Sequence, residues 1–240
     1  MTLDELINAL FPAGHNVRVE PADVLCGTAR YDGNRTAAVI GVVNAAPLGV
    51  EGALALAGRV LDVIRDSPGR PILVLIDTQG QRMRRRDELL GLNEYLAHLT
   101  KCLVLAGRLG HPTLGILYGR AAAGAFIATG LAPDALVALP GADPMVMDLP
   151  SIARVTKLPE DKLKALAEGT PVFAPGLEHA LPIGAVTEAW PENELATRLA
   201  EALGAQPGGP DRRDEVGLER RGRLKAALIA KRITREAADA

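Results

Sequence analysis

Two runs of apolar residues constrain the fold of this chain more than any other feature of its sequence. Residues 72–76 read Ile-Leu-Val-Leu-Ile, and residues 113–117 read Thr-Leu-Gly-Ile-Leu. A strand that lacks polar alternation belongs in a sheet covered on both faces, because a half-exposed strand alternates apolar with polar residues. Each run leads through a turn into a helical pattern, at residues 86–107 and 125–130. This alternation favours right-handed crossovers onto a mostly parallel sheet, so we expect an α/β fold.

The remaining elements fit the same architecture up to about residue 205. The expected strands are residues 17–19, 24–31, 37–43, 135–139 and 184–190, and the further helices are residues 3–10, 52–66, 151–156, 160–167 and 192–203. Residues 206–210, Gln-Pro-Gly-Gly-Pro, form a linker by composition. We therefore expect one domain at residues 1–205. The linker and a basic C-terminal helix at residues 214–237 come after it, within residues 206–240.

The C-terminal segment differs in charge from the rest of the chain. Residues 207–240 carry nine Lys or Arg against six Asp or Glu, whereas the whole chain has a formal net charge of −2. A basic helix of this kind is either a solvated helix end or a docking arm for an acidic partner or a sister subunit. The sequence leaves both interpretations open.

The overall composition argues against several classes of partner. A net charge of −2 provides no bulk attraction to nucleic acid or to an anionic membrane, so we expect neither as a partner. The acidic N-terminus lacks the basic and apolar regions of a secretory signal, and no run approaches the roughly 20 apolar residues that span a bilayer. We expect a cytoplasmic protein in which Cys26 and Cys102 are buried free thiols.

The usual catalytic motifs are missing from the sequence. Neither of the two serines, Ser67 and Ser151, lies in a Gly-x-Ser-x-Gly elbow, which argues against a serine hydrolase. The four histidines are scattered without metal-ligand spacing, so we expect no metal site. Neither a Gly-x-x-x-x-Gly-Lys phosphate loop nor a Gly-x-Gly-x-x-Gly fingerprint occurs, so nucleotide chemistry lacks its usual supports.

Two strand-to-helix turns remain as candidate functional sites. Residues 77–81 and 118–126 each follow an apolar strand and carry little side-chain bulk, so a ligand can approach the backbone closely. A helix that begins at such a turn directs unpaired N–H groups and positive dipole potential towards it. This arrangement suits a negative oxygen, such as that of a thioester enolate or a carboxylate. Tight packing of helix on sheet is the alternative reason for small residues after a strand.

The order of these features resembles the carboxyltransferase branch of the crotonase superfamily. In that branch, a strand ending in Asp-Thr-Pro-Gly is followed by a long helix, a strand that begins after proline, and a Gly-Ala turn that opens a helix. This chain has Asp-Thr-Gln-Gly at residues 77–80, then a helix, Pro112 with its strand, and finally Gly124 and Ala125. The resemblance implies a crotonase-like (ClpP/crotonase) α/β fold, which is a superhelix of ββα units.

A finer resemblance is to the gamma subunits of biotin-independent malonate decarboxylases. It covers about residues 15–205 and rests on the order of short stretches at residues 118–126, 139–142, 145–156 and 170–176. It implies a subunit that forms a decarboxylase with a crotonase-like beta subunit and is active only with that partner. The implied substrate is a malonyl thioester on the phosphopantetheine-type arm of an acyl carrier protein, decarboxylated to the acetyl thioester. No cofactor or metal is expected to bind directly.

The resemblance also assigns roles to residues of the two turns. It implies that the Gly124 and Ala125 amides form an oxyanion hole, with Gly80 and Gln81 lining the facing turn. Gln79 replaces the usual proline of the family, which leaves an additional N–H and a side-chain amide in the site.

The second turn departs from the family pattern at Ala123. This alanine stands where the biotin enzymes have glycine, so its backbone is less free to adopt a positive φ angle.

Arginines near both turns are further candidates for the site. Arg120 lies beside the second turn, where it either pairs with a substrate carboxylate or forms a surface salt bridge. Arg82 and residues 84–86 come after the first turn. At the start of a solvated helix these arginines are ordinary, although unfavourable with the helix dipole. The alternative is contact with an anionic phosphopantetheine arm, a carrier protein or a sister subunit.

Two rival functions stay open at the level of sequence. A carboxyltransferase subunit of a biotin-dependent decarboxylase or carboxylase uses the same scaffold to move CO2 rather than release it. A non-catalytic scaffold stabilises the beta subunit and docks the carrier protein. A requirement for biotin identifies the first rival, and insensitivity to substitution at Gly124 and Ala125 identifies the second.

Overall fold

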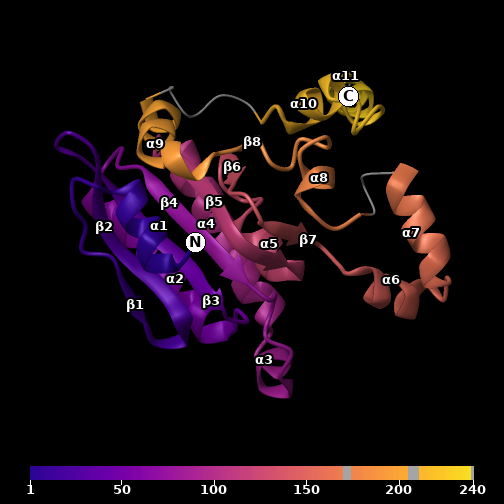
Figure 1. The fold of residues 1–240 in the computed structure, drawn as a ribbon, viewed down its shortest axis with the longest axis horizontal. Helices are drawn as coiled ribbons and strands as arrows, with labels where there is room; N and C mark the ends of the chain where they lie inside the picture. The colour runs from indigo at the N-terminus through magenta and orange to yellow at the C-terminus, as the bar shows by residue number, and fades with distance from the viewer. Residues whose placement is uncertain (170–173, 205–210, 239–240) are drawn as a thin grey trace.

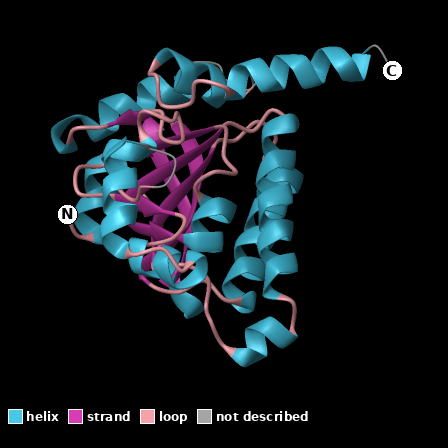
Figure 2. Ribbon diagram, turned by 90° about the vertical axis from the view of Figure 1, so that its right-hand side faces the viewer, coloured by secondary structure: helices cyan, strands magenta, loops and turns pink. Residues whose placement is uncertain are grey.

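The computed structural model of the chain describes residues 1–169, 174–204 and 211–238, which form a mixed sheet of eight strands with helices on both faces (Figures 1 and 2). The strand order is β1-β2-β3-β4-β5-β6-β8, and β7 pairs with the far end of β5. The pairs β1–β2 and β2–β3 are antiparallel, and the remaining pairs are parallel. The expected α/β fold with a mostly parallel sheet is confirmed.

The bounds of the elements agree with most of the expected segments. The strands are β1 (Arg18–Glu20), β2 (Val24–Asp32), β3 (Arg35–Ala45), β4 (Ile72–Thr78), β5 (Thr113–Ala122), β6 (Ala135–Ala138), β7 (Asp143–Met145) and β8 (Glu188–Ala189). The helices are α1 (Leu3–Leu10), α2 (Val50–Asp66), α3 (Arg85–Leu89), α4 (Leu92–Arg108), α5 (Ala123–Thr129), α6 (Leu149–Thr156), α7 (Glu160–Gly169), α8 (Leu177–Ala180), α9 (Leu195–Gly204), α10 (Arg213–Glu219) and α11 (Ala226–Ala238), with the 3-10 turns η1 (Pro21–Asp23) and η3 (Glu192–Glu194).

The apolar run of β4 is buried on both faces, as its sequence demands. Ile72, Val74 and Ile76 pack in one core with residues of α2 and α4. Leu73 and Leu75 pack in a second core with residues of α1 and α9. Burial on both faces leaves no position on the strand for a polar side chain until the strand ends. Polar chemistry is therefore confined to the strand ends.

Two expected elements differ from the structure, and one strand was not expected. The single helix expected at residues 86–107 is two helices, α3 and α4, because Gly91 adopts a φ of 77° between them. The strand expected at residues 184–190 is reduced to the two residues of β8. The sequence pattern does not indicate β7, because a three-residue strand that contains Pro144 shows no alternation.

The basic C-terminal helix is also divided, into α10 and α11, with Arg221 at a φ of 60° between them. α10 is fixed to the body of the protein by the Arg220 guanidinium, which donates hydrogen bonds to the carbonyl oxygens of Leu181, Val186 and Thr187. α11 runs outward and leads to the C-terminus (Figure 2).

Some expectations fall outside the described residues. The linker at residues 206–210 lies there, and so do residues 170–173 of one stretch that carries the resemblance. The division of the chain at residue 205 therefore remains a prediction. Among the described residues, no helix is both long and apolar enough to cross a membrane. The same residues contain no group of three His, Cys, Asp or Glu side chains that could hold a metal ion.

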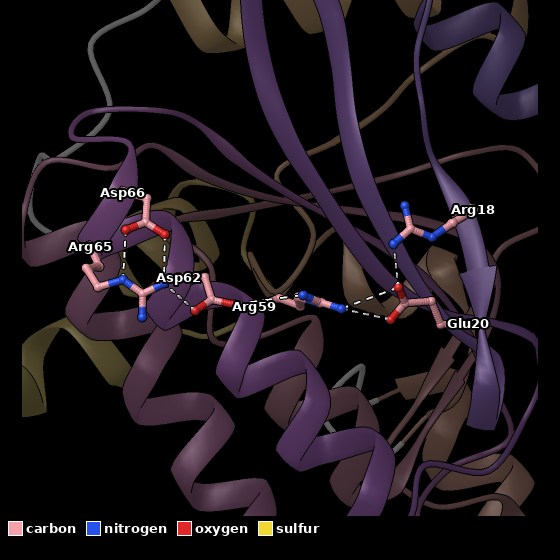
Figure 3. A network of polar contacts seen from close by, with 6 residues as sticks. All are labelled: Arg18, Glu20, Arg59, Asp62, Arg65 and Asp66. Carbon is pink, nitrogen blue, oxygen red and sulfur yellow. Dashed lines mark hydrogen bonds and ion pairs between the residues drawn. The ribbon is translucent and has the colours of Figure 1, made fainter.

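A series of ion pairs joins the edge strand β1 to α2 (Figure 3). Glu20 accepts hydrogen bonds from Arg18 at 2.9 Å and from Arg59 at 3.2 Å. Arg59 in turn lies 3.9 Å from Asp62, which also pairs with Arg65 at 3.0 Å. Glu20 is 21% exposed, but the other side chains of the series are 45% exposed or more, so each pair contributes little to stability. The series supports an edge of the sheet and lies outside both candidate turns.

A buried carboxylate fixes the N-terminus of α2. Asp87, in α3, is 1% exposed. It accepts hydrogen bonds from the Val50 N–H at 3.1 Å and from the Arg82 guanidinium at 2.8 and 3.0 Å. The guanidinium lies over Gly49, where a Cβ would come within 2.2 Å of it. Arg82 thus ties α3 to the start of α2 from inside the protein.

This arrangement corrects part of the interpretation of the arginine cluster after the first turn. Arg82 and Arg86 both form ion pairs with Glu51. The Arg82 side chain is 19% exposed and is an internal contact, whereas the Arg86 side chain is 63% exposed and stays solvated at the start of α3. Arg84 and Arg85 are exposed and remain candidates for contact with an anionic partner.

Replacing Asp87 by asparagine is expected to lower the free energy of unfolding at pH 7 by about 3 kcal/mol, because the change leaves the Arg82 charge without its buried partner. Hydrogen bonds from Arg82, and then from Val50, lower the pKa of Asp87 from 3.8 to about 2 in the folded chain. The contribution of the Asp87 carboxylate to the free energy of unfolding is therefore complete above about pH 4 and is lost as the pH falls from about 4 towards 2. Urea unfolding of the parent chain and of Asp87→Asn across this pH range measures this contribution.

The matched control is Asp66→Asn. Asp66 pairs with Arg65, but its side chain is 57% exposed, so its replacement should leave the free energy of unfolding close to that of the parent. An equal loss in both variants, or a difference for Asp87→Asn that persists unchanged to pH 2, would contradict the role given to Asp87.

Candidate active site

The sheet loses its regular register at the carboxyl ends of β3, β4 and β5, where the candidate turns begin. β4 pairs regularly with both neighbours as far as Ile76. From Ile76 to the next paired residue, Thr78, β4 advances two residues, while β3 advances three, from Val42 to Ala45, and β5 advances four. Extra residues of this kind bend a strand and redirect the chain beyond the bend. β4 is thus flanked by a bulge on each side.

The first turn, residues 77–81, is held from inside the sheet. The buried Thr78 hydroxyl donates to the Ala46 carbonyl at 2.6 Å and accepts from the Gly80 N–H at 3.2 Å. The Leu48 N–H donates to the Gly80 carbonyl at 2.9 Å. Gly80 adopts a φ of 121°, which a side chain would strain. Both polar groups of the Gly80 backbone are therefore paired, and this turn forms a fixed wall of the site.

The second turn opens α5 with a strained residue. Ala123 has a φ of 53°, in the left-handed region that costs a residue with a Cβ about 1–2 kcal/mol. Alanine was expected to be less free than glycine to adopt a positive φ, yet Ala123 adopts one. Ala123 therefore holds, at an energetic cost, an angle that glycine adopts freely.

One side chain joins the two turns. The Gln81 Oε1 accepts a hydrogen bond from the Gly124 N–H at 2.8 Å. A Cβ on Gly80 would lie 3.5 Å from the Cβ of Ala123, so the turns are also in close contact. Ala125 comes next, inside the protein, with no exposed surface. The partner of the Gly124 N–H is a side-chain carbonyl, which can rotate away without unfolding the turn.

The structure therefore brings together Gly80, Gln81, Ala123 and Gly124, as expected for one site. Gln79 is exposed beside them. The roles that the resemblance implies for these residues stay predictions.

Arg120 is exposed on the part of β5 that pairs with β7. Its Nη2 lies 3.5 Å from the Met145 Sδ. Hydrogen bonds from Ser151 lower the pKa of Asp148, and the charge of Arg120 contributes to this shift. The surface salt bridge expected as an alternative is not formed within the described part of the chain.

A third segment at this edge of the sheet has no clear signal in the sequence. Asn44 and Ala45, at the end of β3, have φ angles of 62° and 50°. Positive φ is uncommon outside glycine and collects at functional sites. Ala45 donates its N–H to the Asp77 carboxylate at 2.9 Å. The one sequence feature that indicates a positive φ here is Asn44, because asparagine tolerates this conformation better than most residues.

Comparison with known proteins places the chain in a family. The sequence model of the family described as malonate decarboxylase gamma subunit matches residues 43–237. The chain is also similar to the malonyl-S-ACP:biotin-protein carboxyltransferase MADD of Malonomonas rubra. The two are 31% identical over 203 residues, which cover 76% of this chain and 70% of the relative.

Solved structures agree with the sequence comparison. A Pseudomonas malonate decarboxylase hetero-tetramer in complex with coenzyme A contains a chain that is 28% identical, with a TM-score of 0.81 over 97% of this chain and 98% of that one. Transcarboxylase 12S is 20% identical, with a TM-score of 0.70 over 84% of this chain and 40% of its own. This second likeness shows the fold alone, and the crotonase-like fold is confirmed. Because the family match spans both turns and most of the sheet, the chain belongs to the malonate decarboxylase gamma subunit family.

Proposed function

We propose that this chain is the gamma subunit of a biotin-independent malonate decarboxylase and helps to decarboxylate a malonyl thioester on an acyl carrier protein to the acetyl thioester. The observation that carries the proposal is the family match over residues 43–237, which includes both turns of the candidate site. The similar Pseudomonas decarboxylase was solved with coenzyme A, a thiol that forms acyl thioesters.

The reaction sets one clear demand on the site. Decarboxylation breaks the bond between the carboxylate carbon and the α-carbon, and CO2 leaves. The electron pair of that bond passes into the thioester, which becomes an enolate with negative charge on its oxygen. A proton then reaches the α-carbon and completes the acetyl group. The site must stabilise an oxygen whose charge grows during the reaction, and backbone N–H donors do so without titrating.

In the proposed mechanism the N–H groups of Gly124 and Ala125 donate to this oxygen. At rest, the Gln81 Oε1 occupies the Gly124 N–H at 2.8 Å. The thioester oxygen takes its place, and rotation of the carboxamide then brings the Gln81 Nε2 to the same oxygen as a further donor. Gly80 and Ala123 form the walls of the site, and their small size allows the close approach that this exchange requires.

Two exposed side chains, Arg120 and Gln79, contact the outer part of the substrate in this proposal. Arg120 pairs with the malonyl carboxylate on arrival, and the Gln79 amide offers hydrogen bonds to the acyl arm. A solvated guanidinium suits this role better than a buried one, because tight binding of the carboxylate in the ground state would oppose the loss of CO2.

The proposed active unit contains more than this chain. The phosphopantetheine-type arm of an acyl carrier protein brings the acyl group, and no cofactor binds the subunit directly. A crotonase-like beta subunit completes the site, so this chain is active only in a hetero-oligomer. The assembly of the similar Pseudomonas enzyme as a hetero-tetramer supports this proposal.

Replacing Gly124 by valine is expected to lower kcat by about 100-fold or more, because a lost oxyanion donor removes roughly 3 kcal/mol of transition-state stabilisation. A Cβ added at this position would lie 3.3 Å from both the Gln81 Oε1 and the Leu96 Cδ1, so the branched side chain must displace the turn. Decarboxylation of malonyl-carrier protein by the assembled complex measures the effect, and size-exclusion chromatography checks assembly.

The control is Gly58→Ala in α2, where an added Cβ meets no atom within 4 Å. This variant should retain full activity. Unchanged turnover in an assembled complex that carries Gly124→Val would remove Gly124 from the mechanism and favour the interpretation of this chain as a scaffold.

We expect the decarboxylase activity to depend on the beta subunit. The purified chain alone should have no measurable decarboxylase activity, and addition of the beta subunit and malonyl-carrier protein should restore it without any biotinylated protein. Carbon dioxide release measures both. Full activity of the chain alone would overturn the shared site.

One observation favours a second candidate function. The Malonomonas relative, 31% identical, is a biotin-protein carboxyltransferase, so transfer of the carboxyl group to biotin is the specific alternative. The same reconstitution separates the two functions, because a transferase subunit needs the biotinylated acceptor and a direct decarboxylase does not.

A further inference from the structure

We infer that Asp77 is a positioning residue for the proposed site, because its carboxylate locks together the two irregular strand ends from which both turns are placed. The inference rests on the proposed function of those turns. Asp77 acts through the backbone: its partners are two main-chain N–H groups, neither of which is proposed to meet the substrate.

The carboxylate replaces the main-chain acceptors that the two bulges remove. Regular pairing of β4 with both neighbours stops at Ile76, immediately before Asp77. The Asp77 Oδ2 accepts from the Ala45 N–H of β3 at 2.9 Å, and its Oδ1 accepts from the Arg120 N–H of β5 at 3.1 Å. The contact with Ala45 is part-buried and the contact with Arg120 is exposed, and a main-chain N–H that leaves the regular ladder needs another acceptor, from a side chain or from water. The Asp77 side chain supplies both acceptors, with one carboxylate oxygen for β3 and the other for β5.

The space around Asp77 fits this role independently of its hydrogen bonds. A Cβ on Gly119 would lie 2.3 Å from the Asp77 Oδ1. Gly119 is not among the residues with positive φ, so glycine is required there for space and not for backbone conformation. The carboxylate therefore occupies a place that β5 leaves open for it.

Each of the two bonds leads to one wall of the site. Beyond Ala45 the chain reaches Leu48, whose N–H donates to the Gly80 carbonyl at 2.9 Å and so holds the first turn. Beyond Arg120, β5 runs directly into the turn that presents the Gly124 N–H. The separation between the fixed wall and the proposed donor therefore depends on both bulges, and Asp77 is bonded to both.

The arrangement requires a carboxylate rather than a side chain of similar shape. Both partners are N–H donors, so both side-chain oxygens must accept. Asparagine has the same shape but one acceptor, and its NH2 group would face an N–H group. Asp77→Asn therefore breaks one of the two bonds with almost no change in volume.

The experiment compares Asp77→Asn with Asp23→Asn in the complex with the beta subunit. Asp23 lies at the same edge of the sheet, where its Oδ1 accepts from the Asn44 Nδ2 at 2.9 Å, and asparagine keeps that acceptor. For Asp77→Asn, kcat for malonyl-carrier protein should fall by about tenfold to 100-fold, since small displacements of reacting groups have effects of this size. KM should stay close to that of the parent, and Asp23→Asn should retain the parental kcat. An unchanged kcat, or a rise in KM alone, would overturn the inference.

A second variant covers the case in which Asp77→Asn fails to assemble. Gly119→Ala keeps the carboxylate but displaces it, and should reproduce the fall in kcat at unchanged KM. Combining the two substitutions should cost no more than either alone, because both act on the same contact. Parental kcat in Gly119→Ala would overturn the inference.

Hydrogen exchange in the resting complex separates failure of this inference from failure of the proposed function. Peptides that cover residues 44–49 and 119–125 should exchange faster in Gly119→Ala and in Asp77→Asn, while a peptide from residues 92–108 should not change. This readout needs no activity, so a complex that does not decarboxylate malonyl thioesters refutes the function alone. Unchanged exchange near Gly124 refutes the role of Asp77.

Discussion

Burial of β4 and β5 on both faces is the constraint on which the rest of the structure depends. Alternate residues of β4 enter two different cores, one with α2 and α4 and one with α1 and α9. An apolar strand of this kind leaves no side chain free for catalysis along its length. The backbone at the strand end remains, because parallel strands of one sheet deliver their carboxyl ends, and the helix starts that come after them, to the same edge. The chemistry by peptide N–H groups that we propose therefore follows from how the core is built.

The same edge holds much of the backbone strain outside glycine. Asn44, Ala45 and Ala123 have φ angles of 62°, 50° and 53°, at the ends of the strands on either side of β4. Strained residues persist only where the surrounding contacts over-determine them. Here the contacts are the two bonds to Asp77 and the packing of Ala123 against Gly80. Rigid turns of this kind hold a donor in place before the substrate arrives, which is what stabilisation of a transient charge requires.

Local features of the chain were predictable from sequence, and features that join distant segments were not. The apolar runs at residues 72–76 and 113–117 predict β4 and the start of β5 because periodicity is a property of neighbours. The small residues at 123–125 likewise mark a turn. The bond from Arg120 to Asp77 spans 43 residues, and the pairing of Arg82 with Glu51 and Asp87 depends on how α2 and α3 meet. No pattern in one sequence specifies such contacts, and short elements such as β7 carry too few residues to show a period.

The hydrogen bond between Gln81 and Gly124 shows how a helix start proposed to bind substrate differs from one that is permanently capped. A structural cap is a permanent partner, because an unpaired buried donor costs about 1–3 kcal/mol. In the proposed mechanism the Gly124 N–H must donate to a transient oxygen, and it faces the same cost whenever the site is empty. The Gln81 side-chain carbonyl, 2.8 Å from this nitrogen, would meet both conditions, because it pairs the N–H at rest and can leave by rotation about single bonds without breaking the sheet. A proline at position 79 would remove one N–H from this turn, whereas Gln79 keeps it. The first turn of this chain therefore combines a main-chain wall, fixed by Thr78 and Leu48, with a removable side-chain acceptor one residue further on.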